Sequence, residues 1–343
     1  MMRGGKGGWA MRGTRIRCAA LLARALLAAA LLACAGAPAQ AREKSPEQPL
    51  EKQRLILDWF PNADHVPLYA ARDLGIFKKH GLDIEFVPPA DPNDPLKLVA
   101  AGQAAFAVGY EPSIITARSQ GLPVKAIGIL IDSPLSCLLF LKKSGIRTAA
   151  NLKGKRIGYS VESIDLPLLR AVAAFGGLTP DDYTPVNIKF NLTSSLLTGQ
   201  VDAVMGAFWN YELLEVEREK QPGGTLRLED HGVPPYSEMV FISSDAFLKT
   251  HRDVARRFVL AVQEGIVFAK AHPQEAFAVF AKSNPEANED LDREAFQLSL
   301  SLFATSQVQS TAQWARWAKF AKDHGLIATA VRVEDLLANV AVK

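Results

Sequence analysis

The chain has 343 residues, and its charge is unevenly distributed along its length. It carries 39 Lys and Arg against 36 Asp and Glu, but residues 1–41 hold six of the basic residues and none of the acidic ones. Residues 42–343 therefore carry 33 basic and 36 acidic side chains, a net charge of −3. Such a balance argues against a nucleic-acid-binding protein, because the basic excess belongs to the amino-terminal segment alone.

The first 41 residues have the pattern of a secretory signal peptide. A basic start is followed by an Ala/Leu-rich run, and Ala39-Gln40-Ala41 fits the A-x-A rule for cleavage. We therefore expect export to the periplasm, with residues 42–53 as a linker between the leader and the fold. The segment Leu31-Leu32-Ala33-Cys34 resembles a lipobox, so a lipid anchor on Cys34 is an alternative for the exported form.

Beyond the linker, strand and helix patterns alternate. Hydrophobic periodicity and turn residues predict strands at 54–58, 82–87, 104–109 and 123–130, with helices from Pro67 to the Gly75 region, at 94–103 and at 112–121. This βαβ order is typical of an α/β protein with a mostly parallel sheet covered by helices. Cys137 follows, in the apolar segment CLLFL, and as the single cysteine after the leader it is expected to be a buried, inert thiol.

Two segments of the chain recur after about a hundred residues. RLILDW…VPLYAA is similar to KRIGYS…LPLLRA, and AGQAAFAVG (101–109) is similar to TGQVDAVMG (198–206). Two lobes of the same βα construction would produce this repeat, and chance similarity between βα units is the alternative.

The last third of the chain is mainly helical. After a strand predicted from Ser237, helical spacing is found at 245–271, 273–282, 288–303, 310–324 and 333–340. The chain is therefore predicted to cross between lobes near 137–143 and near 237–243. Lobe 1 would begin with residues 54–140 and be completed by 238–343, and lobe 2 would comprise 141–237. Small ligands bind in clefts bordered by the carboxyl ends of such strands.

Several of these segments resemble the ThiY-like thiamine-pyrimidine-precursor binding proteins of the SsuA/ThiY-like family. The resemblance rests on LDWFPNADHVPLYAARDLGIFKKHGLDIEF (57–86), NLKGKRIGYS (151–160), LLTGQVDAVMGAFWNYELLEVE (196–217) and DAFLKTHRDVARRFVLAVQEGIVFAKAHPQEA (245–276). Within them, L-D-W-x-P-N-x-x-H and W-N-Y-E are the segments specific to the pyrimidine branch. The resemblance covers nearly all of residues 54–340.

This resemblance implies a type II periplasmic-binding-protein fold, with two α/β lobes, a hinge and an inter-lobe ligand cleft. It also implies a monomeric substrate-binding component that delivers its ligand to an ABC permease at the inner membrane. The implied ligand is a 4-amino-2-methylpyrimidine, either hydroxymethylpyrimidine or its formyl-aminomethyl relative. No cofactor is expected, and no Cys/His cluster has the spacing of metal ligands.

The turns that follow the predicted strands carry side chains suited to an aminopyrimidine. Carboxylates and amides can accept from its exocyclic amine, and aromatic faces, with Trp59 and Trp209 in corresponding places of the two lobes, can stack on its ring. The candidate ligand-binding residues are Trp59, Asn62, His65, Tyr110, Glu111, Trp209, Tyr211 and Glu212. Each has a structural alternative: Trp59 in the core, His65 bonded to the nearby backbone, and Glu111 at a helix start.

Other functions remain open at this point. Fungal synthases of the same broad family consume their own histidine and a cofactor, and carry a cysteine-rich segment ahead of a D-x-F-L-K motif. Here that place reads HGVPPYSEMVFISSDAFLK, without cysteine, so we expect no enzyme. Binding of riboflavin or another flat heterocycle, and a sensor role, are alternatives. A sulfonate or nitrate is opposed by the acidic Asp58, Glu111 and Glu212.

Overall fold

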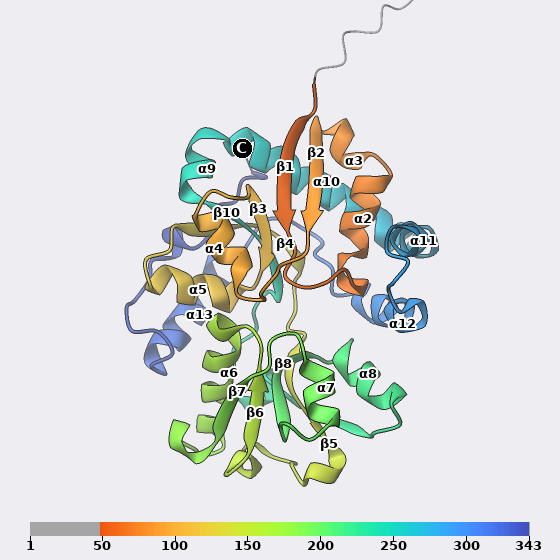
Figure 1. Cartoon of the computed structure of the whole chain (residues 1–343). Helices are drawn as coiled ribbons and strands as arrows, with labels where there is room; N and C mark the ends of the chain where they lie inside the picture. Colours follow the sequence, from red (N-terminus) through yellow and green to blue (C-terminus); the bar gives the residue numbers. More distant parts are fainter. Residues whose placement is uncertain (1–48, 343) are drawn as a thin grey trace, which may run out of the picture. The chain divides into compact units, whose positions relative to one another are not determined.

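The structure is a computed structural model that describes residues 49–342 (Figure 1). The predicted signal peptide, Cys34 and most of the predicted linker lie outside these residues. The strands are β1 Glu51–Ile56, β2 Leu82–Val87, β3 Phe106–Gly109, β4 Val124–Ile131, β5 Ser136–Leu141, β6 Arg156–Tyr159, β7 Thr184–Asn187, β8 Ala203–Phe208, β9 Gly223–Arg227 and β10 Met239–Ser244. The α-helices are α2 Val66–Asp73, α3 Ile76–Lys79, α4 Asp94–Ala100, α5 Glu111–Ser119, α6 Glu162–Phe175, α7 Leu192–Leu197, α8 Glu212–Arg218, α9 Asp245–Thr250, α10 Arg252–Ala271, α11 Pro273–Ser283, α12 Glu289–Ser299 and α13 Thr311–Asp323.

The strands form two mixed sheets with the same construction. The first sheet has the order β2-β1-β3-β10-β4 and the second has the order β7-β6-β8-β5-β9. In the first, β10 runs antiparallel to β3 and β4, and in the second, β5 runs antiparallel to β8 and β9. The segments that resemble each other in sequence therefore occupy equivalent places, since β1 corresponds to β6 and β3 to β8. We call the first sheet and its helices lobe 1, and the second sheet and its helices lobe 2.

The chain crosses between the sheets at residues 132–135 and again between β9 and β10. The first crossing comes earlier than the predicted 137–143, because all six residues of β5 are buried and each pairs with β8, with β9 or with both. An apolar strand of this kind cannot serve as a hinge, whereas Asp132, Ser133 and Pro134 leave the sheets without a ladder partner. Lobe 2 therefore begins near Ser136 rather than at residue 141.

Two further segments differ from the predictions. Residues 51–53, expected in the linker, are the start of β1, where Glu51 pairs with Leu82 of β2. The expected helix at 333–340 is reduced to the 3₁₀ turn Val333–Asp335, and the residues after it pack on lobe 1, with Leu337 forming a bridge to Ala126. In both cases tertiary contacts override a weak local pattern.

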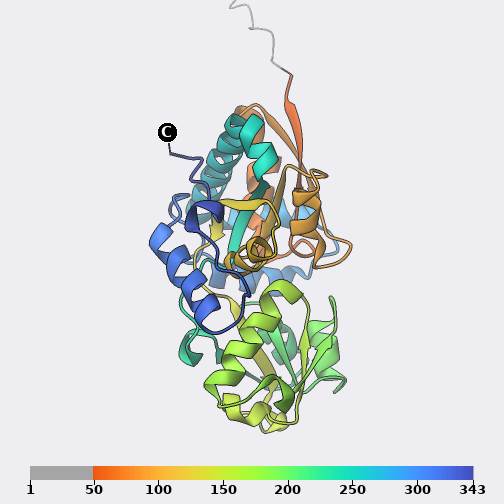
Figure 2. The same cartoon turned by 90° about the vertical axis from the view of Figure 1, so that its left-hand side faces the viewer.

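The carboxyl-terminal helices complete lobe 1. The α10 helix packs on α2, α3 and β4, and its Phe258 stacks between Phe77 and Phe106 at centroid distances of 5.7 and 4.1 Å. In α13, Trp314 and Trp317 are fully buried, so both aromatic side chains pack in the core. Figure 2 shows this last helix beside the first sheet's lobe, where it contacts α5.

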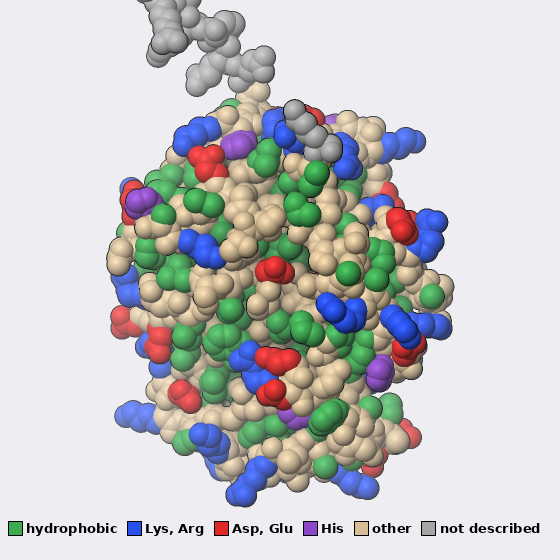
Figure 3. All heavy atoms as spheres, turned by 180° about the vertical axis from the view of Figure 1, so that it is seen from behind, with side chains coloured by type: hydrophobic (Ala, Val, Ile, Leu, Met, Phe, Trp, Pro, Cys, Tyr) green, Lys and Arg blue, Asp and Glu red, His purple; other side chains and the backbone are tan. Residues whose placement is uncertain are grey.

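The outer surface shows no concentration of one charge on the face drawn in Figure 3, where basic and acidic side chains are interspersed. Within residues 49–342, no helix combines the length and the apolar character needed to cross a bilayer.

Candidate functional site

A cavity lies between the two lobes, at the carboxyl ends of β1, β3, β6 and β8. The space free of protein atoms is about 500 Å³, a figure that includes the opening to solvent. The lining residues are Asp58, Trp59, Asn62, Asp64, Tyr110, Ser136, Ser160, Val161, Ile164, Asp165, Leu192, Gly206, Phe208, Tyr211 and Glu212.

The wall from lobe 1 is built around Asp58, which is buried just after β1. One of its carboxylate oxygens accepts a hydrogen bond from the Tyr110 hydroxyl, and the other lies 2.9 Å from Nε2 of His65. Nδ1 of His65 accepts from the backbone N–H of Asn62, so the ring proton is on Nε2 and is donated to Asp58. His65 is fully buried and does not line the cavity. Its hydrogen bond orients the Asp58 carboxylate.

Asn62 and Asp64 connect this wall to the opposite lobe. Oδ1 of Asn62 caps the short turn Ala63–His65 by accepting from the backbone N–H of Asp64. The buried Asp64 carboxylate in turn accepts from Nδ2 of Asn210 at 3.1 Å and from the Ser299 hydroxyl at 2.6 Å. Burial raises the pKa of Asp64 to about 6. Because Asn210 belongs to lobe 2 and donates both to Asp64 and to Ser299 of lobe 1, its bonds hold the two lobes together.

The wall from lobe 2 begins with Glu212, the first residue of α8. Its Oε2 accepts from the backbone N–H of Phe208 at 2.6 Å, whereas Oε1 accepts no hydrogen bond from another residue of the described chain. Burial, followed by repulsion from Glu215, raises the pKa of Glu212 to about 8. Tyr211 and Phe208 place aromatic rings beside this carboxyl group, and burial raises the pKa of the Tyr211 hydroxyl.

Trp59 lines the cavity as expected, but its aromatic neighbour from the other lobe is Phe190 and not Trp209. The Trp59 and Phe190 rings meet edge to face, with centroids 4.7 Å apart, and Phe190 also contacts the exposed Phe60. This contact places an aromatic group at the boundary between the lobes.

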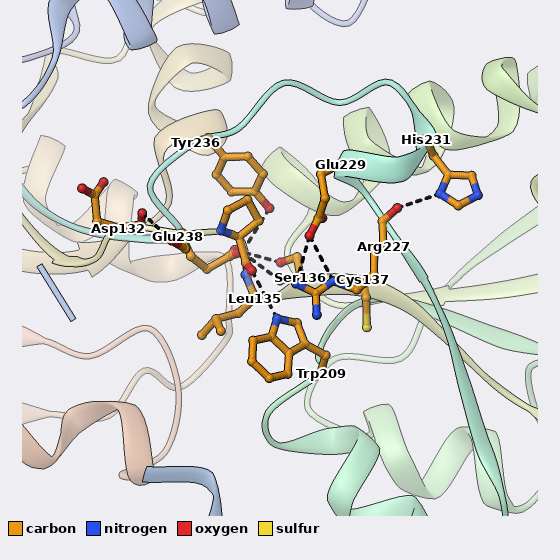
Figure 4. Close-up of polar contacts among 12 residues, drawn as sticks. Asp132, Leu135, Ser136, Cys137, Trp209, Arg227, Glu229, His231, Tyr236 and Glu238 are labelled. Carbon is orange, nitrogen blue, oxygen red and sulfur yellow. Dashed lines mark hydrogen bonds and ion pairs between the residues drawn. The ribbon is translucent and has the colours of Figure 1, made fainter. Parts of the chain in front are cut away.

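Trp209 and Glu111, also expected at the ligand, lie outside the cavity lining. The Trp209 indole donates to the Pro134 carbonyl at 3.2 Å, and the Arg227 guanidinium lies 4.6 Å from its ring centroid (Figure 4). Glu111 is fully buried beside the second crossing, where it accepts from the Ser237 backbone N–H and from the Gln313 side chain. Both residues therefore support the crossings between the lobes.

Glu238 joins the two crossings directly. Its carboxylate accepts from the backbone N–H groups of Leu135 and Ser136 at 2.6 and 2.8 Å, and from the Ser136 and Tyr236 hydroxyls (Figure 4). Leu135 is the last residue of the first crossing and Tyr236 lies near the end of the second, so one buried side chain fixes both. Burial raises the pKa of Glu238 to about 7.

Asp165 and Ser160 line the cavity but are not among the eight candidates. Asp165 is buried in the first turn of α6, where Oδ2 accepts from the backbone N–H groups of Ser160 and Val161 at 2.8 Å each. The sequence does carry a signal for it. Asp165 stands three, four and seven residues before the apolar Leu168, Leu169 and Val172, so an acid occupies the core-facing stripe of the helix.

The electrostatic character of the cavity is acidic. Four carboxyl groups line it, from Asp58, Asp64, Asp165 and Glu212, and no Lys, Arg or His of the described chain is among the lining residues. Such a lining favours a ligand that is neutral or cationic and rich in N–H or O–H donors, and it disfavours an anion.

Comparison with known proteins shows the family of this chain. The model of the family described as NMT1/THI5 like matches residues 62–276. The chain belongs to this family. A thiamine biosynthesis protein of Haemophilus influenzae is 37% identical over 287 residues, covering 83% of this chain and 91% of that protein. A formylaminopyrimidine-binding protein of Halalkalibacterium halodurans is 33% identical over 266 residues, covering 78% of this chain and 81% of that protein.

More distant matches bear on the fold and on the enzyme alternative. The alkanesulfonate-binding protein of Xanthomonas axonopodis pv. citri superposes with a TM-score of 0.68 at 18% identity, covering 84% of this chain and 98% of that one. This likeness confirms the expected periplasmic-binding-protein fold. A 4-amino-5-hydroxymethyl-2-methylpyrimidine phosphate synthase of Saccharomyces cerevisiae is 28% identical over 282 residues, covering 79% of this chain and 83% of that protein.

Proposed function

We propose that the protein is the substrate-binding component of an ABC importer and captures a 4-amino-2-methylpyrimidine precursor of thiamine between its two lobes. The observation that carries this proposal is the composition of the cavity lining: four carboxyl groups, aromatic rings from both lobes and no basic side chain among the described residues. The binding protein of Halalkalibacterium halodurans, whose name contains such a pyrimidine, supports the same ligand class.

The ligand's chemistry matches this lining group by group. An exocyclic amine next to a ring nitrogen presents two N–H donors, which suits the Glu212 carboxyl group, whose Oε1 accepts from no other described residue. Trp59, Phe208 and Tyr211 supply aromatic surface for the flat ring. Of the eight candidate residues, Trp59, Asn62, Tyr110, Tyr211 and Glu212 line the cavity and are proposed to contact the ligand. His65, Glu111 and Trp209 are proposed to act through Asp58 and through the two crossings.

Closure of the lobes would complete the site. Besides the bonds of Asp64 to Asn210, Asn93 of lobe 1 donates to the Ser160 carbonyl and accepts from the Glu162 backbone N–H in lobe 2. These contacts need both lobes in place, so a ligand that touches both walls would favour the closed arrangement.

A role as a pyrimidine phosphate synthase is less well supported. The product named for the yeast relative carries a phosphate group. An enzyme that makes it would profit from a Lys, an Arg or a glycine-rich cradle at the cavity, whereas the described lining is acidic. The same acidity disfavours a sulfonate or nitrate, although the fold is shared with a sulfonate-binding protein. We therefore propose a binding protein and not an enzyme.

Location and partner follow from the proposed role. Residues 1–41 would direct export or, in the alternative form with a lipid anchor, the residues before Cys34 would do so, and the exported monomer would dock on an ABC permease at the inner membrane.

Isothermal titration of the leaderless protein tests the ligand. Refolding first removes any ligand carried through purification. Hydroxymethylpyrimidine and its formyl-aminomethyl relative are the test ligands, and riboflavin, taurine and nitrate are the controls. We expect micromolar or tighter binding of a pyrimidine and no heat with the controls. Binding of riboflavin or of an anion in place of the pyrimidines would contradict the proposed ligand.

A further inference from the structure

A short turn joins β7 to α7, and both of its ends are anchored in lobe 2. Before the turn, Ile188 is buried and its backbone N–H donates to a carbonyl of β6 at 3.0 Å. After it, the backbone N–H of Asn191 donates to the Ile188 carbonyl at 2.9 Å, and Leu192 is buried. The tip of the turn, formed by Lys189 and Phe190, projects between these anchors. Movement of the turn is therefore confined to its tip.

Lys189 has an unfavourable backbone conformation. Its φ of +50° lies in the left-handed region, where a residue with a Cβ atom is uncommon. Two contacts offset this cost. The Lys189 N–H donates to Oδ1 of Asn187 at 3.0 Å, and its Nζ lies 3.8 Å from Oδ2 of Asp91 in lobe 1. Because one of these contacts comes from the opposite lobe, the conformation of the turn depends on lobe 1.

Phe190 contacts lobe 1 with its ring. The ring centroid lies 4.7 Å from that of Trp59 and 4.8 Å from that of Phe60. Phe60 is 50% exposed and Phe190 is half-buried, so this aromatic contact lies at the surface. Aromatic pairs attract each other beyond the area that they bury, and a pair at the surface can separate without opening the core. The contact can therefore form and break while both lobes stay folded.

These rings stand where the cavity meets an outer groove between the lobes. The residues that line both spaces are Trp59, Asn62, Leu192, Tyr211 and Glu212. Phe60 and Phe190 line the outer groove and do not line the cavity. Trp59 thus borders the cavity and also carries the ring of Phe190. The aromatic contact therefore lies on the groove side of the cavity.

The other bonds between the lobes do not involve this turn. Asn210 of lobe 2 donates to Asp64, and Asn93 of lobe 1 donates to the Ser160 carbonyl. Loss of the Phe190 contact would leave these bonds in place. The turn can therefore move without a separation of the lobes.

We propose that the turn at Lys189 and Phe190 is a gate between the outer groove and the cavity. The entrance is closed while Phe190 sits on Trp59 and Phe60. Withdrawal of the tip, with loss of the pair between Lys189 and Asp91, opens it. This proposal rests on the proposed function, which supplies the ligand for its test. Such a gate sets the rates of entry and exit and leaves the affinity almost unchanged, because it opens equally in the free and the loaded protein.

Stopped-flow fluorescence tests the gate. The refolded, leaderless protein is mixed with hydroxymethylpyrimidine or its formyl-aminomethyl relative, and the tryptophan signal is followed because Trp59 lines the cavity. Isothermal titration gives Kd separately. In Phe190→Ala we expect the association and dissociation rates each to rise roughly tenfold, as the loss of an aromatic pair would give, with Kd within about threefold of that of the unmodified protein.

Phe60→Ala removes the same contact from the side of lobe 1. Both rates should rise in this variant as well. The double variant should be no faster than Phe190→Ala, because the two rings act through one contact. If Phe190→Ala does not fold, Phe60→Ala decides the matter alone, since Phe60 is half exposed.

Phe175→Ala is the matched control, because Phe175 is an exposed aromatic residue of lobe 2 that lines neither the cavity nor the outer groove. Its rates should equal those of the unmodified protein. A rise in the dissociation rate alone, with a matching rise in Kd, would show that the ring stabilises the bound state and would overturn the gate. Unchanged rates in the folded variants would also overturn it and leave the proposed function standing. Absence of binding of either pyrimidine would overturn both.

Discussion

Glu212→Gln is the substitution that most directly examines the acidic wall of the cavity. The side chain keeps its size, and the amide oxygen can still accept from the Phe208 backbone N–H, now 2.6 Å from Oε2. The other oxygen becomes an NH₂ group, so a donor faces the donor of the ligand. Leaving a buried donor of the ligand without its acceptor costs about 1–3 kcal/mol, which corresponds to a rise in Kd of about 5- to 150-fold for the pyrimidine.

The fold should tolerate this change well. The carboxyl group of Glu212 is buried and its pKa is raised to about 8, which means that its charged form is unfavourable in the ligand-free protein. Replacing it with a neutral amide should therefore leave the melting temperature unchanged or higher. A structural explanation for the lost affinity would instead require a lower melting temperature.

Isothermal titration and thermal melting of the same samples separate these outcomes. Glu217→Gln is the control, because Glu217 is an exposed residue of the same helix and receives the same substitution. The control should bind within twofold of the unmodified protein. An affinity of Glu212→Gln that also stays within twofold would show that the ring amine is bound elsewhere, and the orientation proposed for the ligand would be refuted.

Three further outcomes follow from the buried acids and the thiol. The stability of the ligand-free protein should fall as the pH rises from about 4 to about 8, because acids with a raised pKa keep their protons to higher pH in the folded chain than in the unfolded chain. Melting temperatures measured across this pH range test the prediction. A melting temperature that rises with pH would contradict it. The acids concerned are Asp64, Glu111, Asp165, Glu212, Glu238 and Asp292. Glu238→Ala should lower the free energy of unfolding in urea by about 2–4 kcal/mol, because it leaves the Leu135 and Ser136 N–H groups buried without an acceptor. Glu229→Ala is the control and should have little effect, because Glu229 is exposed. Cys137 is fully buried and burial raises the pKa of its thiol, so a thiol reagent should label it only as fast as the protein unfolds, and rapid labelling of the native protein would contradict this packing.

Sequence patterns located most strands and helices because their signals are local. The strand at 82–87 and the turn residues after β1 and β3 were predicted at or near their observed places, and the carboxyl ends of these strands do border the cavity. Position after a strand does not, however, fix the direction of a side chain. Tyr110 and Glu111 are neighbours, yet Tyr110 turns towards Asp58 and Glu111 towards Ser237 at the second crossing.

Residues that depend on long-range packing were the ones missed. Trp209 was expected at the ligand because it follows β8, but the first crossing lies beside it and its indole bonds to Pro134. Asp165 was missed because it lies six residues beyond the end of β6, and only the approach of α6 to Gly206 brings it to the cavity. Neither relation is encoded in the local spacing of residues.

The chain order of the strands determines which of the two sheets can be completed first during synthesis. Lobe 2 is built from one uninterrupted stretch, since all five strands of its sheet lie between Ser136 and Arg227. Lobe 1 is not, because β10, which separates β3 from β4 in its sheet, begins only at Met239. When the chain emerges from the ribosome or from a translocation channel, lobe 2 can therefore complete its sheet first. The sheet of lobe 1 lacks the strand between β3 and β4 until β10 has emerged.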